Sequence, residues 1–547
     1  MTTFSAMKRQ EVMDRLDSEL FDVVVIGGGI TGAGIALDAV TRGLKTALIE
    51  MQDFASGTSS RSTKLVHGGL RYLKQFEIKE VAELGKERAI VYENGPHVTT
   101  PERMLLPFHK GGTFGSFSTA IGLQVYDFLA GVKKSERRTM LNVGQTIKQA
   151  PLVKKDGLQG SGMYVEYRTD DARLTIEVMK AAAEKGAVIL NYAKAAGFTY
   201  DDGQKIDGVH VQDMTSNKKL TIQAKKVINA TGPWVDEVKD LDGTTSGKHL
   251  ILSKGIHLVF DQSVFPLKQA IYFDTPDKRM IFAIPREGKT YVGTTDTFYE
   301  GDPNEMQITE ADRAYILHAI RYMFPKVDIT AMDVESSWAG VRPLVHEDGK
   351  SPSEISRKDE IWESEKGLIT IAGGKLTGYR KMAETVVNKV VRQLSNETGR
   401  KFPRSITKHF PISGGDIGGS SNYQRFIRQA VERGQAAGFT ERESRHLAAL
   451  YGSNVDQVFA IPYEPATDMP RILYVKLRYA IEQEMTVKPT DFFVRRTGDL
   501  YFHIANVRAG KMDVLNEMAA ILKWSGDQRT QYEEELNEEI RKATTVV

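Results

Sequence analysis

The chain has 547 residues, of which 41% are hydrophobic and 26% are charged. At roughly 100–200 residues per domain, this length corresponds to about three domains. The 73 lysine and arginine residues balance 71 aspartate and glutamate residues, so the charge gives no indication of a nucleic-acid partner. The absence of cysteine excludes disulfides, thiolate metal sites and cysteine nucleophiles, so redox chemistry would require a bound cofactor.

Membrane-spanning segments are not expected. No run of about 18 apolar residues occurs, and the charged N-terminal residues do not look like a secretion signal. The most membrane-like stretch is residues 114–132, FGSFSTAIGLQVYDFLAGV, which the basic KKSERR follows. We expect either a buried amphipathic helix or an interfacial patch that touches lipid. The composition fits a cytoplasmic protein, with or without peripheral contact at the inner face of the cell membrane.

Residues 21–50 predict a βαβ unit. FDVVVI is a β-branched apolar run typical of a buried parallel strand. GGGITGAGIALDAVTRG has helical spacing and ends at Gly43, and KTALIE is a second strand. Residues 51–75 are rich in Gly, Ser and Thr, and they follow at the place where a doubly wound sheet carries its ligand loops.

The later elements change in kind along the chain. Residues 171–185 predict a helix, and the strands AVILNYAK, GVHVQD, KLTIQA and KKVINATG follow it. Between about 250 and 340 strands dominate, which indicates an antiparallel sheet inserted into the α/β domain. GLITIAGG then predicts a buried strand before the long amphipathic helix KLTGYRKMAETVVNKVVRQL. After roughly residue 400, charged helical segments indicate a separate helical domain.

A glycine fingerprint opens the predicted helix of the βαβ unit. Gly27, Gly29 and Gly32 satisfy G-x-G-x-x-G, and Glu50 closes the next strand 23 positions after Gly27. The glycines allow a tight turn, a close approach to a pyrophosphate and close packing of helix on strand. The helix start offers free N–H groups to phosphates, and a carboxylate at Glu50 would bind the ribose hydroxyls of an adenosine. These features predict a dinucleotide-binding site.

Two later segments favour FAD as the dinucleotide. GLITIAGGKLTGYR ends its strand in two glycines before a helix. The N-terminus of that helix could face the pyrimidine edge of a flavin and stabilise negative charge on the reduced ring. KKVINATG, with Gly232, is a third close backbone approach, although an ordinary strand end would give the same pattern.

These segments, with TSSRSTKLVHGGLRYL, resemble the FAD-dependent glycerol-3-phosphate dehydrogenases of the aerobic respiratory type. The resemblance runs from about residue 20 to 395 through HGGLRYL, VINATGPW, KGIHLVF, AGVRPL and GGKLTGYR, and the helices after 400 match that family's C-terminal domain. It implies an α/β fold with a Rossmann-like FAD-binding domain, an inserted antiparallel-sheet substrate domain and a C-terminal all-helical domain. The implied ranges are 20–105, 151–240 and 341–398 for the FAD-binding domain, 106–150 (with the segment that could face a membrane) and 241–340 for the substrate domain, and 399–547 for the helical domain.

The resemblance also implies a reaction in glycerol catabolism. The substrate would be sn-glycerol 3-phosphate, which passes a hydride from C2 to flavin N5 and becomes dihydroxyacetone phosphate, while a quinone takes the electrons. The related glycerol-3-phosphate oxidases, which use O2, often carry an additional insertion, and no obvious extra segment occurs here. The sequence leaves the oligomeric state open, with a homodimer as one option.

Substrate binding requires fixed cations, because the substrate carries a phosphate and arginine offers planar, bidentate contacts to it. Family positions that line the substrate pocket match Arg71, Tyr72, Arg342, Arg357 and Lys375. A single loop arginine is often only a solvated or structural ion pair, and Arg357 lies in the least distinctive stretch. Arg342 and Lys375 are also expected to act in catalysis, Lys375 by stabilising negative charge as the hydride leaves.

His257, in KGIHLVF, is the predicted catalytic base. An imidazole with an ordinary pKa of about 6.5 accepts a proton near neutrality. Strand alternation places Gly255, His257 and Val259 on one face, which is compatible with a cavity-facing side chain but also with a core histidine. His67 is the alternative, in the loop expected to pass near the flavin.

The residues expected to bind the cofactor come from all of these motifs: Gly27, Gly29, Gly32, Glu50, Thr58, Ser59, Lys64, Gly232 and Thr377. Loop hydroxyls such as those of Thr58 and Ser59 also commonly cap turns. Neither a histidine pair with zinc spacing nor an acidic calcium loop is present, so no metal site is expected.

Two other functions are alternatives. An amine or amino-acid oxidase on the same scaffold would need one arginine for a carboxylate, and the several candidate arginines with Lys375 disfavour it. A non-catalytic FAD-binding protein would use its C-terminal helices to bind RNA or another protein. Acids interleave with bases there, as in YEEELNEEIRK, which is more typical of a solvated helical face.

Overall fold

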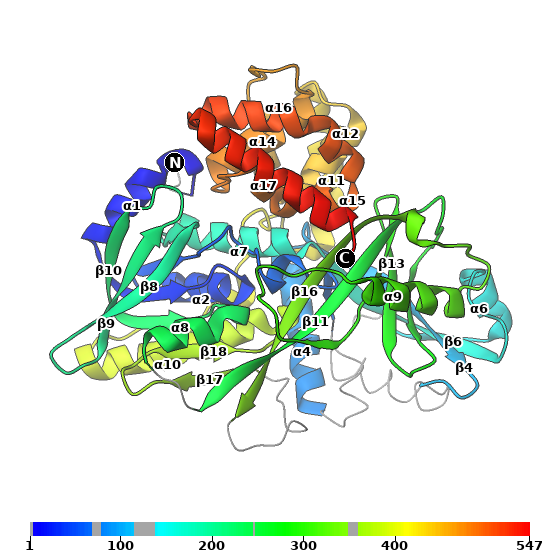
Figure 1. Ribbon diagram of the computed structural model, residues 1–547, viewed down its shortest axis with the longest axis horizontal. Coiled ribbons are helices and arrows are strands. Elements are labelled where there is room, and N and C mark those ends of the chain that lie inside the picture. Colours follow the sequence, from blue (N-terminus) through cyan, green and yellow to red (C-terminus); the bar gives the residue numbers. More distant parts are fainter. Residues whose placement is uncertain (1–3, 68–77, 114–136, 244–246, 348–358) are drawn as a thin grey trace.

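The computed structural model describes residues 4–67, 78–113, 137–243, 247–347 and 359–547. Two sheets lie side by side, and the C-terminal helices, orange and red in Figure 1, lie above them. The predictions for Arg71, Tyr72 and Arg357 lie outside the described residues, as does the prediction for residues 114–132.

The first sheet, sheet A, contains the βαβ unit. Its main strands lie in the order β17–β18–β10–β1–β2–β7, and β9 and β8 extend it beside the first half of β10. The strands from β18 to β7 run parallel to one another. The bounds are β1 Leu20–Ile26, β2 Thr46–Ile49, β7 Val188–Leu190, β8 Ala193–Tyr200, β9 Ile206–Asp213, β10 Lys219–Asn229, β17 Glu360–Glu363 and β18 Ile369–Ala372. Residues 21–26 of β1 are buried, as the continuous apolar run predicts for a central parallel strand.

Helices cover sheet A, and the helix of the βαβ unit lies in their centre. They are α1 Arg9–Ser18, α2 Ile30–Thr41, α7 Asp171–Glu184, α8 Val235–Leu241 and α10 Tyr379–Thr398. Helix α2 packs against both α7 and α10. A Cβ atom on Gly34 would lie 2.9 Å from Cδ2 of Tyr379, so the small residues of α2 permit this close helix packing.

The second sheet, sheet B, is largely antiparallel. Its strands lie in the order β15–β11–β14–β13–β12–β4–β6–β3, with β16 on the other side of β11 and β5 beside β6. The bounds are β3 Leu65–Val66, β4 Thr99–His109, β5 Thr139–Leu141, β6 Leu158–Thr169, β11 Lys248–Asp261, β12 Ala270–Asp274, β13 Met280–Arg286, β14 Lys289–Gly293, β15 Thr297–Tyr299 and β16 Val334–Glu347. The helices α4 Ile78–Asn94, α6 Val143–Gln149 and α9 Glu310–Met323 accompany this sheet.

The membership of the two sheets does not follow the boundaries of the domain ranges expected from the sequence. Strand β6 belongs to sheet B although it lies in the range 151–240, and β16 continues past residue 341. The segments KLTIQA and KKVINATG also form one strand, β10, and not two. Strand pairing depends on partners that are distant in the sequence, which local patterns do not reveal.

The C-terminal helices form a separate group that contacts both sheets. They are α11 Tyr423–Ala436, α12 Glu441–Tyr451, α13 Val455–Phe459, α14 Arg471–Gln483, α15 Asp499–Phe502, α16 Ile504–Leu522 and α17 Gly526–Thr544, with a π-helical turn at Asp491–Arg496. That turn contacts α7, and α15 and α17 contact β16. The three-part α/β fold is therefore confirmed. None of the helices in the described ranges combines the length and apolarity needed to cross a bilayer.

Candidate active site

A cavity of about 660 Å³ opens where the ends of β1, β10 and β18 meet strands β11, β13 and β16. Small-molecule and cofactor sites typically have volumes of about 300–1,000 Å³. On the side of sheet A, the lining is rich in residues with little or no side chain, namely Gly27, Gly29, Ala230, Gly232, Gly373 and Gly374. A large ligand can therefore lie directly against backbone at three loops.

Two of the three fingerprint glycines, Gly27 and Gly32, are required by the local geometry. Gly27 has φ +114°, and a Cβ atom there would lie 2.5 Å from the carbonyl oxygen of Ala230. A Cβ atom on Gly32 would overlap the carbonyl oxygen of Gly27, so Gly32 lets the start of α2 pack against the turn. Gly29 lines the cavity and immediately precedes α2. The start of α2 thus presents its N–H groups to the cavity, as a pyrophosphate site requires.

Glu50 lies at the end of β2 and also lines the cavity. Its carboxylate accepts hydrogen bonds from the N–H groups of Gly28 (2.6 Å) and Gln52 (2.9 Å). Burial raises the pKa of Glu50, and these two hydrogen bonds oppose that shift. The arrangement holds a carboxylate beside the fingerprint, where the ribose of a dinucleotide would lie.

Side-chain hydroxyl groups form hydrogen bonds that connect the neighbouring loops at the cavity wall. The Ser59 hydroxyl accepts from the N–H of Ile30 (3.0 Å), and the Thr58 hydroxyl donates to the Val341 carbonyl (2.6 Å). The Thr377 hydroxyl accepts from the N–H of His67 (3.1 Å) and donates to the carbonyl of the same residue (3.0 Å). All three hydroxyl-bearing residues line the cavity, so the structure brings Thr58, Ser59 and Thr377 together with the fingerprint.

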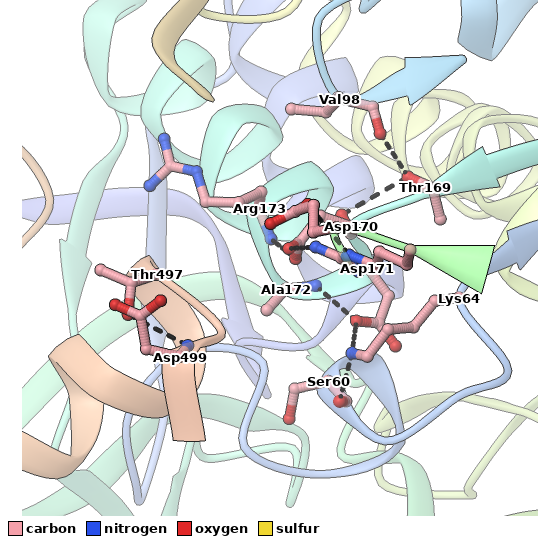
Figure 2. A network of polar contacts seen from close by, with 12 residues as sticks. Ser60, Lys64, Val98, Thr169, Asp170, Asp171, Ala172, Arg173, Thr497 and Asp499 are labelled. Carbon is pink, nitrogen blue, oxygen red and sulfur yellow. Dashed lines mark hydrogen bonds and ion pairs between the residues drawn. The ribbon is translucent and has the colours of Figure 1, made fainter. Parts of the chain in front are cut away.

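Lys64, which was predicted to bind the cofactor, is not among the residues that line the cavity. Its side chain is buried, and its Nζ atom lies 2.6 Å from Oδ1 of Asp171 and donates to the carbonyl of Ser60 (3.0 Å). Figure 2 shows this pair within the polar network at the start of α7. The side chain of Lys64 therefore forms a structural ion pair, whose partner lies 107 positions away in the sequence.

The predicted catalytic residues His257, Arg342 and Lys375 meet at the same cavity. In the β11–β16 pairing, Ser253 lies opposite Arg342 and His257 lies opposite Trp338. The Nη1 atom of Arg342 lies 3.4 Å from Oδ1 of Asp296. Arg342 is half-exposed, so its guanidinium remains accessible to a ligand.

His257 is held closely by its surroundings. Its ring stacks on Trp338 at a centroid distance of 4.7 Å and an angle of 11°, and its Nε2 atom lies 3.1 Å from Oγ1 of Thr63. Burial first, and then the positive charges of Arg342 and Lys64, hold the pKa of His257 well below its ordinary value of 6.5. The imidazole is therefore neutral at neutral pH.

His67 lies at the cavity as well, and burial lowers its pKa. The charge of Glu166 opposes that shift, while Lys375 and Arg342 add to it. The backbone of His67 is bonded to Thr377, which fits the expected place of this loop beside the flavin.

Several lining residues were not identified from the sequence. They include Thr63, Trp234, Glu166, Asp296 and the stacked pair Tyr272 and Phe282, whose ring centroids lie 4.1 Å apart. Of the described lining residues, Arg61, Lys278, Arg279, Arg342 and Lys375 are cationic, and Glu50, Glu166 and Asp296 are acidic. The excess of cations favours an anionic ligand. Within the described parts of the chain, no three potential metal ligands come together.

The fold and cavity together define a flavin-dependent oxidoreductase. Residues 22–380 match the family of FAD dependent oxidoreductases, and residues 405–529 match the C-terminal domain of alpha-glycerophosphate oxidase. The chain is 60% identical over 539 residues to the aerobic glycerol-3-phosphate dehydrogenase of Bacillus subtilis (strain 168), covering 98% of this chain and 97% of that one. It is 59% identical over 543 residues to the Staphylococcus aureus (strain MRSA252) protein of the same name, covering 98% of each chain.

Solved structures agree with this relationship. The glycerol-3-phosphate dehydrogenase from Bacillus halodurans, complexed with FAD, superimposes with a TM-score of 0.86 at 49% identity over 99% of both chains. The L-alpha-glycerophosphate oxidase of Mycoplasma pneumoniae shares the fold alone, with a TM-score of 0.56 at 17% identity over 71% of this chain and 97% of that one. The chain belongs to the aerobic glycerol-3-phosphate dehydrogenase family of FAD-dependent oxidoreductases. The predicted family and cofactor are thereby confirmed.

Proposed function

We propose that the protein oxidises sn-glycerol 3-phosphate to dihydroxyacetone phosphate with bound FAD and passes the electrons to a quinone. The observation that carries this proposal is the meeting, in one cavity, of a dinucleotide fingerprint with a neutral histidine and two candidate phosphate-binding cations. Relatives that are 58–60% identical over almost the whole chain are named aerobic glycerol-3-phosphate dehydrogenases, which supports the same substrate here.

The described residues fit FAD. The turn at Gly27 has no room for a side chain, α2 begins at the cavity wall, and Glu50 stands at the expected distance along the chain for an adenosine ribose. Gly373 and Gly374 bring a third backbone loop to the cavity before α10. FAD, when bound, supplies the ring that accepts a hydride from the C2 carbon of the substrate.

The side chains at the other end of the cavity have separate tasks. Arg342 binds the phosphate, because its guanidinium is permanently charged and half-exposed. Lys375, also a lining residue, stabilises negative charge as the substrate is oxidised. His257 is neutral and buried, so it is the group that takes the hydroxyl proton. Arg71, Tyr72 and Arg357 are proposed as further substrate contacts on the basis of the family resemblance.

The substrate assignment is tested with the purified protein under anaerobic conditions. The protein is expected to show flavin absorbance near about 450 nm, and sn-glycerol 3-phosphate is expected to bleach it. Glycerol tests the need for the phosphate, and sarcosine and glycine test the amino-acid oxidase alternative. Bleaching by sarcosine or glycine, and not by glycerol phosphate, would overturn the proposal.

The electron acceptor is tested in the second half of the reaction. A quinone analogue is expected to restore the oxidised spectrum faster than air does, because the relatives are dehydrogenases by name. Fast re-oxidation by air with formation of hydrogen peroxide would instead indicate an oxidase.

Flotation with lipid vesicles tests peripheral membrane contact through residues 114–132, and sedimentation tests whether the protein forms a homodimer.

A further inference from the structure

Thr63 lies beside the proposed base at the wall of the cavity. His257 is 2% exposed, and its Nδ1 atom is buried and has no hydrogen-bond partner among the described residues. Its Nε2 atom lies 3.1 Å from the hydroxyl oxygen of Thr63. Thr63 lines the cavity and is only partly buried. The hydroxyl of Thr63 is therefore a polar group that lies at the cavity wall and contacts Nε2 of the imidazole directly.

The loop that carries Thr63 is fixed on both sides by one buried carboxylate. Asp171 accepts hydrogen bonds from the backbone N–H (3.0 Å) and hydroxyl (2.7 Å) of Ser62. The same carboxylate binds Nζ of Lys64 (2.6 Å), as Figure 2 shows. Lys64 has φ +57°, a left-handed conformation that a lysine adopts only when its surroundings hold it there. The two neighbours of Thr63 thus set the position of its hydroxyl.

The imidazole is fixed by the same loop. Trp338, which stacks on His257, donates from Nε1 to the carbonyl of Ser62 (3.1 Å). The Tyr291 hydroxyl donates to the carbonyl of Thr63 (3.1 Å). Tyr501 and Phe502 of the C-terminal helices also pack against Trp338, at centroid distances of 5.2 and 5.8 Å. The hydroxyl and the ring are consequently parts of one rigid arrangement.

We propose that Thr63 is a catalytic residue that relays a proton from the substrate to His257. The proposal rests on the function proposed above. The C2 hydroxyl of the substrate gives its proton to Oγ1 of Thr63, while the Thr63 hydroxyl gives its own proton to Nε2 of His257. The C2 hydride leaves to FAD, so the substrate loses one proton and one hydride and becomes a ketone. This direction requires the ring proton of neutral His257 to be on Nδ1.

Variants at Thr63 separate the hydroxyl from the shape of the side chain. Thr63→Val keeps the shape and removes the hydroxyl, while Thr63→Ser keeps the hydroxyl. Thr290→Val is the matched control, because Thr290 is buried in β14, donates its hydroxyl to the Phe265 carbonyl (2.8 Å) and does not line the cavity. The rate of anaerobic flavin bleaching by saturating sn-glycerol 3-phosphate and the substrate concentration at half-maximal rate are measured for each variant.

In Thr63→Val the bleaching rate is expected to fall by about 100-fold, within the usual range for general-base catalysis. The half-saturating concentration should change little, because Thr63 is not proposed to bind the phosphate of the substrate. Thr63→Ser and Thr290→Val are expected to stay within about threefold of the unaltered protein. Adding Thr63→Val to His257→Asn should then cost little more, because residues that act in one step are not additive.

The outcomes are distinguishable. If the unaltered protein is not bleached by sn-glycerol 3-phosphate, the proposed function fails and the relay fails with it. If it is bleached and Thr63→Val is bleached equally fast, only the relay is wrong. Multiplicative losses in the double variant, or failure of serine to restore the rate, also contradict the relay. Flavin content measured on each variant shows whether a lost rate reflects lost cofactor, and Thr63→Ala provides a second hydroxyl-free variant if valine does not fold.

Discussion

Two groups of charged side chains in this protein differ in how their charges are compensated. The interdomain network joins sheet A to the C-terminal helices and consists of Asp53, Arg173, Glu177, Glu484, Asp491, Arg495 and Arg496, all buried. Asp53 binds Arg496 at 2.7 and 2.9 Å and Arg495 at 2.5 Å. Although burial opposes it, Arg496 and Arg495 hold the pKa of Asp53 below its ordinary value. Carboxylates and guanidinium groups pair with one another within the network, while Nε of Arg173, Oε2 of Glu177 and Oε1 of Glu484 are buried without a hydrogen-bond partner among the described residues.

The wall of the cavity is different. Arg342 is half-exposed, its Nη1 atom lies 3.4 Å from Oδ1 of Asp296, and cations exceed acids among the described lining residues. Burial holds the pKa of His257 well below its ordinary value. In the interdomain network burial raises the pKa of Glu177 to about 7 and that of Asp491 above its ordinary value, whereas the paired arginines keep the pKa of Asp53 low. Charged groups that pair with one another in a buried network maintain a structure, and charged groups that line a cavity can contact a ligand. We therefore expect the interdomain network to stabilise the fold and the charged side chains at the cavity wall to bind a ligand.

The largest effect is expected at the base. Replacing His257 by Asn should lower the rate of flavin bleaching by about 100- to 10,000-fold, because the proton acceptor is lost. Flavin content and the thermal unfolding temperature should stay close to those of the unaltered protein. Stopped-flow absorbance measures the rate. A variant that bleaches at the original rate would show that another group is the base.

The interdomain network is tested by Arg496→Met. Removing one partner of a buried ion pair should cost about 3–5 kcal/mol of stability, because it leaves Asp53 with an uncompensated share of its charge. Chemical denaturation measures the loss, and the rate per bound flavin should be almost unchanged. The control is Arg433→Met, whose exposed pair with Asp456 should be worth less than about 1 kcal/mol. Equal losses in the two variants would contradict a structural role for the network.

At Arg342 the comparison predicts the opposite pattern. Arg342→Met should raise the half-saturating concentration of sn-glycerol 3-phosphate by about 10- to 100-fold, since a charge-assisted hydrogen bond contributes about 1.5–3 kcal/mol. Stability should change little, because the side chain is half-exposed. Arg342→Lys should recover only part of the binding, because an ammonium group cannot make bidentate contacts. Unchanged saturation in both variants would remove Arg342 from the phosphate site.

The smallest effect is expected when the rate of flavin bleaching is measured as a function of pH. The pKa of His257 lies well below its ordinary value of 6.5, so the ring stays neutral and able to accept a proton at pH values where an exposed histidine would be protonated. The bleaching rate should therefore be flat from neutral pH to below 6.5 and fall only at more acidic pH. Because the pKa of His257 is lower in the folded protein than in the unfolded chain, protons bind preferentially to the unfolded chain. The contribution of His257 to the free energy of unfolding therefore decreases as the pH falls below the pKa of this histidine in the unfolded chain. A rate that halves near the ordinary pKa would contradict a buried, neutral base.

The sequence was most informative where structure is local. The βαβ unit could be predicted because its apolar runs, its glycines and Glu50 lie within 30 positions and each has a physical reason. The meeting of His257, Arg342 and Lys375 could be inferred only through the family resemblance, because these residues lie on separate elements.

Long-range partners were not predictable. Asp53 is a loop carboxylate whose partners Arg495 and Arg496 lie more than 400 positions away in the sequence. Nothing near Lys64 in the sequence indicates that its side chain pairs with Asp171. Thr63 resembles any hydroxyl in a loop rich in Ser and Thr, since nothing nearby in the sequence indicates the imidazole that it contacts. Strand β6 lies in the range expected for the FAD-binding domain but joins sheet B, because its pairing partner β4 is distant in the sequence.

The most direct test of the central claim is a single anaerobic titration that follows two quantities together. Aliquots of sn-glycerol 3-phosphate are added to the protein, and flavin absorbance and dihydroxyacetone phosphate are measured after each addition. One molecule of dihydroxyacetone phosphate should form for each flavin that is bleached, because a two-electron hydride transfer links them. A bound flavin that stays oxidised, or one that is bleached without formation of this product, would contradict the assigned reaction.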